Sequence, residues 1–279
     1  MPKCLAPLSL APLAKGQGRN ITPCGKCEAC LQTKRQDWTF RLSEEFRHAK
    51  TGHFVTLTYA EGNEPYTPEG YNELSKAHIQ TFMKKLRFHS DHARKVLKWP
   101  PIRFYAAGEY GTMTDRPHYH IILFNVPPDT INDIESIWGL GYIQLSILNH
   151  ARIHYTTKYV IQPKPQNDEQ AKRQPQFALM SRRPGLGSQY IHRAKKWHVD
   201  NLYPYVINEY GAKQSMPRYY KNKIFTEAER EQIKDETIQN TLKIDRKFIE
   251  STPYYFEVEQ TRREAYIHKV KQSSKTKQL

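Results

Sequence analysis

Two histidines one residue apart are the residues of this sequence whose types and spacing most clearly suggest chemistry. His118 and His120 lie at the start of an apolar run rich in β-branched residues. Residues i and i+2 of a strand point to the same face, so a strand here places both imidazoles side by side. Two imidazoles on one face are half of a divalent-metal site. The alternative is a pair of solvated histidines on an ordinary strand.

Glu109 is the candidate third ligand. It ends the preceding apolar run and is separated from His118 by the polar turn 110–115, so one hairpin would bring the carboxylate to the two imidazoles. Such a ligand set leaves coordination positions open, as Mg²⁺ or Mn²⁺ requires in order to bind a phosphate oxygen, and Zn²⁺ would also accept it. The alternative for Glu109 is a surface carboxylate at a strand end.

Tyr155 and Tyr159 are candidate nucleophiles. They are four residues apart in a predicted helix, so both hydroxyls are expected on one helix face. A phenol with a pKa of about 10 is a poor nucleophile, but a metal-polarised phosphodiester and a nearby cation, here Lys158, would allow a phosphotyrosine to form. Tyrosine pairs in a chain with 18 tyrosines are commonly packing residues. The preceding His-x-His strand favours chemistry.

All four cysteines fall within the first 30 residues, at Cys4, Cys24, Cys27 and Cys30. This clustering differs from a disulfide framework distributed through a secreted fold. The last three have a spacing typical of zinc knuckles, and Cys4 could complete a structural four-thiolate zinc site. Three ligands with a free Cys4, or four unligated thiols, are the alternatives.

The elements that must position these residues follow from hydrophobic periodicity. The predicted order is helix 33–50, strand 53–59, helix 75–97, strands 101–108 and 118–125, helix 129–138, strand 141–148 and helix 151–161. From residue 53 this is a split βαβ arrangement, an α+β fold of the ferredoxin or RRM type. It has one antiparallel sheet with helices on one face. The histidine pair lies on a central strand.

The chain is predicted to contain four segments. A Cys-rich element over residues 1–32 precedes the His-x-His core over 33–162, a proline-rich linker over 163–187 and a helical extension over 188–279. Within the extension we expect a helix over 188–197, and a capping box at Thr226 to Glu229 that opens a second helix to about residue 250. The Lys-rich tail is expected to be disordered.

The charge balance indicates a polyanionic partner. Lysine and arginine number 43 against 28 acidic residues, a formal charge of +15, and 12% of residues are aromatic. Basic groups interleaved with aromatic rings suit phosphates and exposed bases, so nucleic acid is the leading partner. The candidate contacts are Arg116, Lys164, Arg182 and Arg183. We find no run of 18 apolar residues and no clear signal-peptide cleavage site, and therefore expect an intracellular protein without a membrane span.

Three ordered motifs carry a resemblance to a known family. The segments 54–59, 117–120 and 155–160 resemble the motifs of rolling-circle replication initiators with the His-hydrophobe-His signature. The two-tyrosine form resembles the initiators of microviruses, which are small single-stranded DNA phages. The cysteine cluster with Trp38 and Arg41, and the segment 217–221, resemble the gokushovirus branch. The resemblance covers most of residues 20–225.

The resemblance implies a metal-dependent, site-specific DNA endonuclease with strand-joining activity. His118, His120 and Glu109 would bind Mg²⁺ or Mn²⁺, and Tyr155 or Tyr159 would attack the origin phosphodiester. The products would be a 5′-phosphotyrosine and a 3′-OH primer for the host polymerase, and the second tyrosine would later help to close the displaced strand into a circle. Related proteins often carry a lysine where this chain has Gln162, a role that Lys158 or Lys164 could take.

The resemblance also implies origin DNA as the substrate and the cytoplasm of a bacterial host as the location. The chain lacks a Gly-x-x-x-x-Gly-Lys loop, so a host helicase would be needed. Three alternatives stay open: a plasmid relaxase or transposase with the same chemistry, a non-catalytic zinc-stabilised protein that binds single strands, and a metal phosphodiesterase that uses water. The origin sequence, the order of tyrosine attack and the oligomeric state do not follow from the sequence.

Overall fold

The computed structural model describes residues 4–10, 20–111, 114–160, 168–251 and 255–275. The chain divides into two compact units. The first, which we call the sheet unit, is Lys34–Arg193, and the second, the terminal unit, combines Met1–Thr33 with Ala194–Leu279. Among the helices of these described ranges, none is long and apolar enough to cross a membrane.

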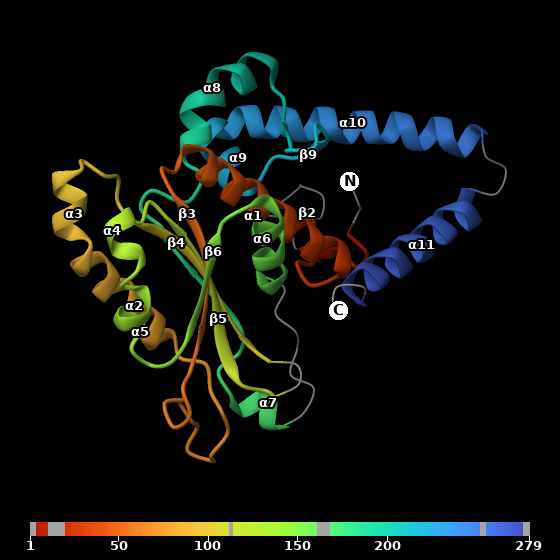
Figure 1. Ribbon diagram of the computed structural model, residues 1–279. Coiled ribbons are helices and arrows are strands. Elements are labelled where there is room, and N and C mark those ends of the chain that lie inside the picture. The colour runs from red at the N-terminus through yellow and green to blue at the C-terminus, as the bar shows by residue number, and fades with distance from the viewer. Residues whose placement is uncertain (1–3, 11–19, 112–113, 161–167, 252–254, 276–279) are drawn as a thin grey trace. The chain divides into compact units, whose positions relative to one another are not determined.

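A five-stranded antiparallel sheet forms the centre of the sheet unit (Figure 1). Its strand order is β6-β3-β5-β4-β7. The strands are β3 (Gly52–Thr58), β4 (Arg103–Tyr110), β5 (Pro117–Phe124), β6 (Ile143–Ile147) and β7 (Phe177–Met180). The predicted α+β class with an antiparallel sheet is confirmed, and β5, which carries His118 and His120, is the middle strand.

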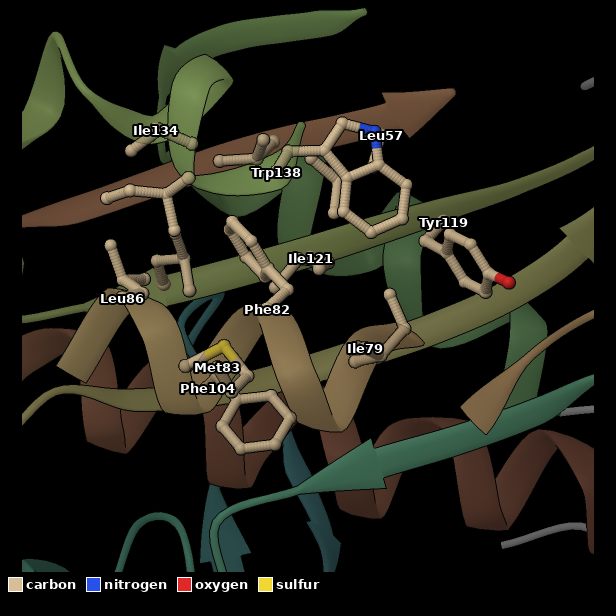
Figure 2. Packing of buried hydrophobic residues seen from close by; sticks show 14 of the residues in the cluster. Leu57, Ile79, Phe82, Met83, Leu86, Phe104, Tyr119, Ile121, Ile134 and Trp138 are labelled. Atoms are coloured by element: carbon tan, nitrogen blue, oxygen red, sulfur yellow. The ribbon is translucent and has the colours of Figure 1, made fainter. Parts of the chain in front are cut away.

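One face of the sheet packs against α2 (Lys76–His89) and α5 (Ile134–Trp138). The buried residues of α2 recur at spacings of three and four, so they form one apolar stripe: Ile79, Phe82, Met83 and Leu86. They meet alternate residues of the strands, including Leu57 and Ile121 (Figure 2). Removing each such side chain from water contributes roughly 1.5–3 kcal/mol to folding. This face supplies the larger of the two cores.

The opposite face of the sheet is also covered by helices, which corrects the expectation of helices on one face. Leu42 of α1 (Glu28–His48) and Ile153 of α6 (His150–Thr156) are fully buried with Tyr105 and Ile122 of the sheet. The reason lies in β5, where residues 121–124 are apolar at every position and buried on both faces. A strand of this kind needs a layer of side chains on each side.

The segment expected to be a linker contains regular structure. Residues 168–172 form α7, and β7 pairs with β4 from Tyr105↔Met180 to Gly108↔Phe177. Phe177 is buried in the larger core, so this edge strand is fixed by packing. Its four residues lie between prolines, and a strand this short has no detectable periodicity in the sequence.

Two of the predicted helices that cover the larger core are divided in the structure. The predicted helix over 75–97 is divided at Ser90 into α2 and α3 (Asp91–Val96). Ser75 caps α2, because its side chain accepts a hydrogen bond from the backbone N–H of His78. The short helix α4 (Pro128–Ile131) precedes α5.

The terminal unit contains two small hairpins and several helices. The hairpins are β1 (Leu8–Leu10) with β2 (Asn20–Thr22), and β8 (Tyr205–Ile207) with β9 (Lys213–Ser215). The helices are α9 (Arg218–Ile224), α10 (Glu227–Ser251), α11 (Tyr255–Lys275) and most of α8 (Gln189–Asn201). The predicted capping box is present, since Thr226 and Glu229 exchange side chain to backbone hydrogen bonds. The tail that we expected to be disordered, marked by Lys269, Lys271, Lys275 and Lys277, is helical as far as Lys275, and Lys277 lies outside the described residues.

We expect the substitution Gly141→Ala to destabilise the sheet unit. A Cβ at this position would overlap the backbone of Thr58 and Ala60, because the chain entering β6 runs directly against the end of β3. The free energy of unfolding should fall by about 1–3 kcal/mol, as for other overpacked sites, in a denaturant titration. Glu135→Ala, at an exposed position of α5, is the control, and equal stability of the two variants would contradict this account.

Candidate metal and tyrosine site

The pairing of β4 with β5 brings the three candidate metal ligands together. Glu109 is the direct cross-strand partner of His118, and His120 lies two residues further along the same face. One carboxylate oxygen, Glu109 Oε1, is 2.7 Å from His118 Nε2 and 2.8 Å from His120 Nε2. Neighbouring ligands of an octahedral Mg²⁺ lie about 3 Å apart, so each of these two distances is close to the spacing in such a ligand shell.

Hydrogen bonds behind the imidazoles fix their orientation. His118 Nδ1 lies 3.2 Å from the carbonyl oxygen of Arg116, which can only accept, so Nδ1 carries the proton of the neutral ring. His120 Nδ1 lies 3.1 Å from the hydroxyl of Thr56 on β3. Both Nε2 atoms therefore face Glu109, and a cation bound there would take the place of the proton that His118 Nε2 shares with the carboxylate.

Burial and hydrogen bonding shift the pKa values of Glu109 and His118 in opposite directions. Burial opposes ionisation of Glu109, but the two histidine hydrogen bonds outweigh it and lower the pKa of Glu109 to about 2. Burial disfavours a charged His118, yet the contact with Glu109 raises the pKa of His118 above its ordinary value. The site thus favours an ionised carboxylate next to a positive charge. A divalent cation would supply the same kind of positive charge beside Glu109.

Tyr155 lies next to this ligand set. Its hydroxyl is 3.5 Å from His120 Nε2, and the two rings meet edge to face at 5.2 Å between centroids. Phe54 holds both residues, since its ring stacks on His120 and contacts Tyr155 edge to face. The phenol remains 37% exposed. A phenol oxygen therefore lies beside the candidate metal position, on a residue that is partly exposed to solvent.

Comparisons with known proteins show which proteins this chain is similar to. The family model described as "Replication-associated protein ORF2/G2P" matches residues 52–164, a range that contains Glu109, His118, His120 and Tyr155. The chain is 26% identical over 261 residues to "Replication-associated protein ORF2" of Spiroplasma virus 4, and the match covers 79% of this chain and 80% of that protein. Over most of its length this chain is thus similar to a replication-associated protein of a small bacterial virus.

Two further microvirus replication-associated proteins extend the comparison. "Replication-associated protein ORF4" of Chlamydia phage 1 is 28% identical over 158 residues, 50% of this chain and 37% of that protein. "Replication-associated protein VP4" of Bdellovibrio phage phiMH2K is 23% identical over 216 residues, 72% of this chain and 66% of that protein. No solved structure matches the chain significantly.

Tyr159, the second candidate tyrosine, lies in a different type of helix from Tyr155. The predicted helix over 151–161 is α-helical only to Thr156, and Thr157–Val160 is a 3₁₀ helix. A 3₁₀ helix has three residues per turn instead of 3.6, so the backbone here differs from the continuous α-helix on which the expectation of a shared face was based. The side chain of Tyr159 lies outside the described residues, and the expectation that both hydroxyls share one face stays a prediction.

The basic residues expected near the site have distinct surroundings. Lys158 Nζ lies 4.9 Å from the centre of the Tyr155 ring, so its charge is close to the phenol. Arg116 forms an ion pair with Glu64 and donates to the carbonyl of Tyr59. Arg182 and Arg183 are exposed in the turn after β7, and Lys164 lies outside the described residues.

Sequence reasoning missed the residues that support His120. Thr56 and Phe54 occupy the same face of β3 as His120 does of β5, with Thr56 its direct cross-strand partner. The alternation of side chains along residues 54–58 predicts which of them share a face of the strand. Only the register between β3 and β5 shows that Thr56 is the partner of His120, and these two residues are 64 positions apart in the sequence. The contact between Thr56 and His120 could therefore not be predicted from the local sequence pattern.

The four cysteines lie together in the terminal unit, with all four sulfur atoms within 4.8 Å of one another. Cys4, the most distant in sequence, is 3.8 Å from Cys27 between sulfur atoms. Burial opposes ionisation of Cys27, but backbone hydrogen bonds, one of them from Leu5, lower its pKa to about 6. Burial raises the pKa of Cys30, so these thiols differ in their tendency to ionise.

Proposed function

We propose that the protein is a rolling-circle replication initiator that nicks single-stranded DNA at a phage origin through a tyrosine nucleophile and a divalent metal. The observation that supports this most directly is the position of the Tyr155 hydroxyl, 3.5 Å from His120 Nε2 at the edge of three converging ligands. The three relatives named above are all replication-associated proteins, which supports a role in DNA replication.

The ligand set suits Mg²⁺ or Mn²⁺. Glu109 Oε1 and the Nε2 atoms of His118 and His120 would hold the ion and leave other coordination positions open. The bound ion would supply Lewis acidity to a non-bridging phosphate oxygen of the scissile nucleotide. The partial burial of these side chains keeps much of the surrounding water away, which strengthens electrostatic attraction to the phosphate.

The protein's own side chains, Tyr155 and Lys158, would carry out the attack on the phosphodiester. The Tyr155 oxygen forms a bond to phosphorus as its proton is lost, and the bond from phosphorus to the 3′ oxygen breaks. The 3′ oxygen takes up a proton and leaves as a free hydroxyl, while the 5′ strand stays attached to Tyr155. Lys158, close to the ring, would stabilise negative charge that develops on the phenol oxygen.

The covalent product explains strand joining without a further energy source. A phosphotyrosine is a phosphodiester, so attack by a 3′-hydroxyl on its phosphorus restores the DNA linkage and releases the tyrosine. In the proposed cycle the host polymerase extends the 3′-OH primer and a host helicase separates the strands in the bacterial cytoplasm. Tyr159 is the proposed second nucleophile, which would cleave the regenerated junction before the displaced strand is closed.

Trapping the covalent product tests this proposal. Purified protein would be incubated with labelled single-stranded DNA spanning its origin and Mn²⁺, followed by denaturing electrophoresis and mass mapping. We expect an adduct on Tyr155 that falls below detection in Tyr155→Phe and persists in Tyr142→Phe, which alters an exposed tyrosine next to β6.

Other outcomes of this experiment would contradict the proposal in different ways. Cleavage without a trapped protein would indicate a water-dependent phosphodiesterase. Unchanged DNA binding with neither adduct nor cleavage, across fragments that span the origin, would indicate a non-catalytic binding protein. An adduct on Tyr159 alone, retained in Tyr155→Phe, would exclude Tyr155 as the required nucleophile.

The hydrogen bond behind His120 gives a second prediction. Thr56→Val removes the hydroxyl that orients His120, so we expect the affinity for Mn²⁺ to fall by about 10- to 100-fold, the usual effect of losing such a contact. Calorimetric titration of Mn²⁺ would measure it. Thr58→Val is the matched control, because the Thr58 hydroxyl bonds to the backbone of Tyr142. Equal losses in both variants would refute a specific role for Thr56.

A further inference from the structure

The cysteine cluster of the terminal unit has the geometry of a metal site separate from the tyrosine site. Cys24 and Cys27 precede α1, Cys30 lies in its first turn, and Cys4 comes from the segment before β1. All four thiols are reduced, and all four sulfur atoms lie within 4.8 Å of one another. Four sulfurs from three separate parts of the segment thus converge on one point.

Backbone amides surround these sulfur atoms. The N–H of Cys24 donates to Cys4 Sγ at 3.2 Å, and the N–H of Leu5 donates to Cys27 Sγ at 3.4 Å. Two more amides, those of Lys26 and Cys27, donate to Cys24 Sγ. Amide donors are strongest toward charged acceptors, so this arrangement favours thiolates over thiols.

The spacing selects a tetrahedral ion over a disulfide. A Zn–S bond of about 2.3 Å places two ligands of a tetrahedron about 3.8 Å apart, and the Cys4 and Cys27 sulfurs are 3.8 Å apart. A disulfide would need about 2 Å. We propose that Cys4, Cys24, Cys27 and Cys30 bind one Zn²⁺ in a closed, structural four-thiolate site.

This site also fixes the contact between the N-terminal segment and α11. Arg263 of α11 donates to the carbonyl oxygen of Leu5, the residue after Cys4. A bound ion would hold Cys4 and, through the neighbouring Leu5, the segment to which α11 bonds. Loss of the ion would therefore release this contact with α11.

Metal analysis of the full chain tests this assignment. We expect about one tightly bound zinc per chain, still present in the His118→Ala/His120→Ala variant, which lacks the other candidate site, and lost in Cys27→Ser. Cobalt substituted for zinc should give the absorption of a four-thiolate tetrahedral site in the unaltered chain and a weaker thiolate band in Cys4→Ser. Removal of zinc should increase hydrogen exchange over residues 255–275.

Several results would overturn the zinc assignment. These are a chain without tightly bound zinc, zinc that disappears in the double histidine variant, or a Cys4–Cys27 disulfide in mass mapping without reductant. A cobalt spectrum of the unaltered chain that is unchanged in Cys4→Ser would exclude Cys4 as a ligand. Because the cobalt spectrum is first taken on the unaltered chain, misfolding of a variant does not decide the outcome.

A different observation, independent of the cysteines, points to a second nucleic-acid surface. Trp197 of α8 contacts Tyr203 and Tyr205 with ring centroids 5.3 and 6.2 Å away, and the two tyrosine rings are 5.1 Å apart. Trp197 is 47% exposed and Tyr203 is 39% exposed. Lys213 of β9 places its ammonium 4.6 Å from the Tyr205 ring centre. We call these four residues the aromatic cluster.

The part of the chain that carries the aromatic cluster is rich in positive charge, which is complementary to phosphate. Over residues 194–224 the acidic residues are Asp200 and Glu209, and the basic ones are Lys195, Lys196, Lys213, Arg218, Lys221 and Lys223. Exposed aromatic rings with neighbouring cations are the two components of sequence-tolerant single-strand binding, since every base has a face that can stack. We propose that this cluster binds single-stranded DNA through stacking of bases on Trp197 and Tyr203. The proposal rests on the proposed function, which supplies such a strand.

Binding measured without cleavage tests the aromatic cluster. In a Tyr155→Phe background, fluorescence anisotropy with a labelled oligothymidylate would give the Kd. We expect Trp197→Ala to weaken binding by about 5- to 150-fold, the effect of losing one stacked base, and Trp197→Phe to restore part of it. Phe88→Ala, which removes an exposed ring of α2, is the matched control and should leave the Kd unchanged.

The binding measurement and the adduct assay test the aromatic cluster and the nicking reaction separately. Equal Kd values for Trp197→Ala and Phe88→Ala would refute the aromatic cluster, whatever the adduct assay shows. A weakened Kd in Trp197→Ala together with no adduct in the unaltered chain would refute the nicking reaction and leave the binding surface intact. Weakening in Trp197→Ala that Trp197→Phe does not relieve at all would exclude stacking as its cause.

Discussion

The register between β4 and β5 is the constraint on which the site depends. It sets Glu109 opposite His118 and places His120 two residues along on the same face. A slip of one residue would turn Glu109 toward the opposite face of the sheet and remove the carboxylate from both imidazoles. Burial fixes this register, because Tyr105 and Ile122 must face α1 while Ala106 and Ile121 must face α2. The packing that holds the sheet together thus also aligns the ligands.

The position of the site along β5 follows from where apolar burial ends. Residues 121–124 are enclosed on both faces, whereas His118 and Glu109 remain partly exposed at the end of the same hairpin. Charged groups buried deeper would suffer a larger desolvation cost, and fully exposed groups would attract a phosphate only weakly. At the strand end the desolvation cost is moderate and the electrostatic attraction is still strong. Ile153 packs α6 against the sheet, and α6 places Tyr155 at this end.

The sequence predicts the parts of the fold that have a long periodic pattern or a local motif. The strand with His118 and His120, the hairpin to Glu109 and the apolar stripe of α2 are of this kind. It does not predict β7, whose four residues are fixed by pairing with β4, or the second helical layer, which depends on α1 meeting a distant sheet. The helix α11 was missed because its charged composition is typical of disordered tails.

The change of helix type after Thr156 bears on how two tyrosines could act in turn. On one continuous α-helix, Tyr155 and Tyr159 would present their hydroxyls to the same point and could exchange roles without movement of the backbone. The backbone at Thr157–Val160 is instead a 3₁₀ helix, in which each residue advances about 120° around the axis where an α-helix advances about 100°. Tyr155 precedes this change, in the α-helical part of the segment, and its ring contacts Phe54 and His120. The packing of α6 against the sheet, rather than the spacing of the two tyrosines, therefore sets the position of Tyr155 beside the candidate ligands.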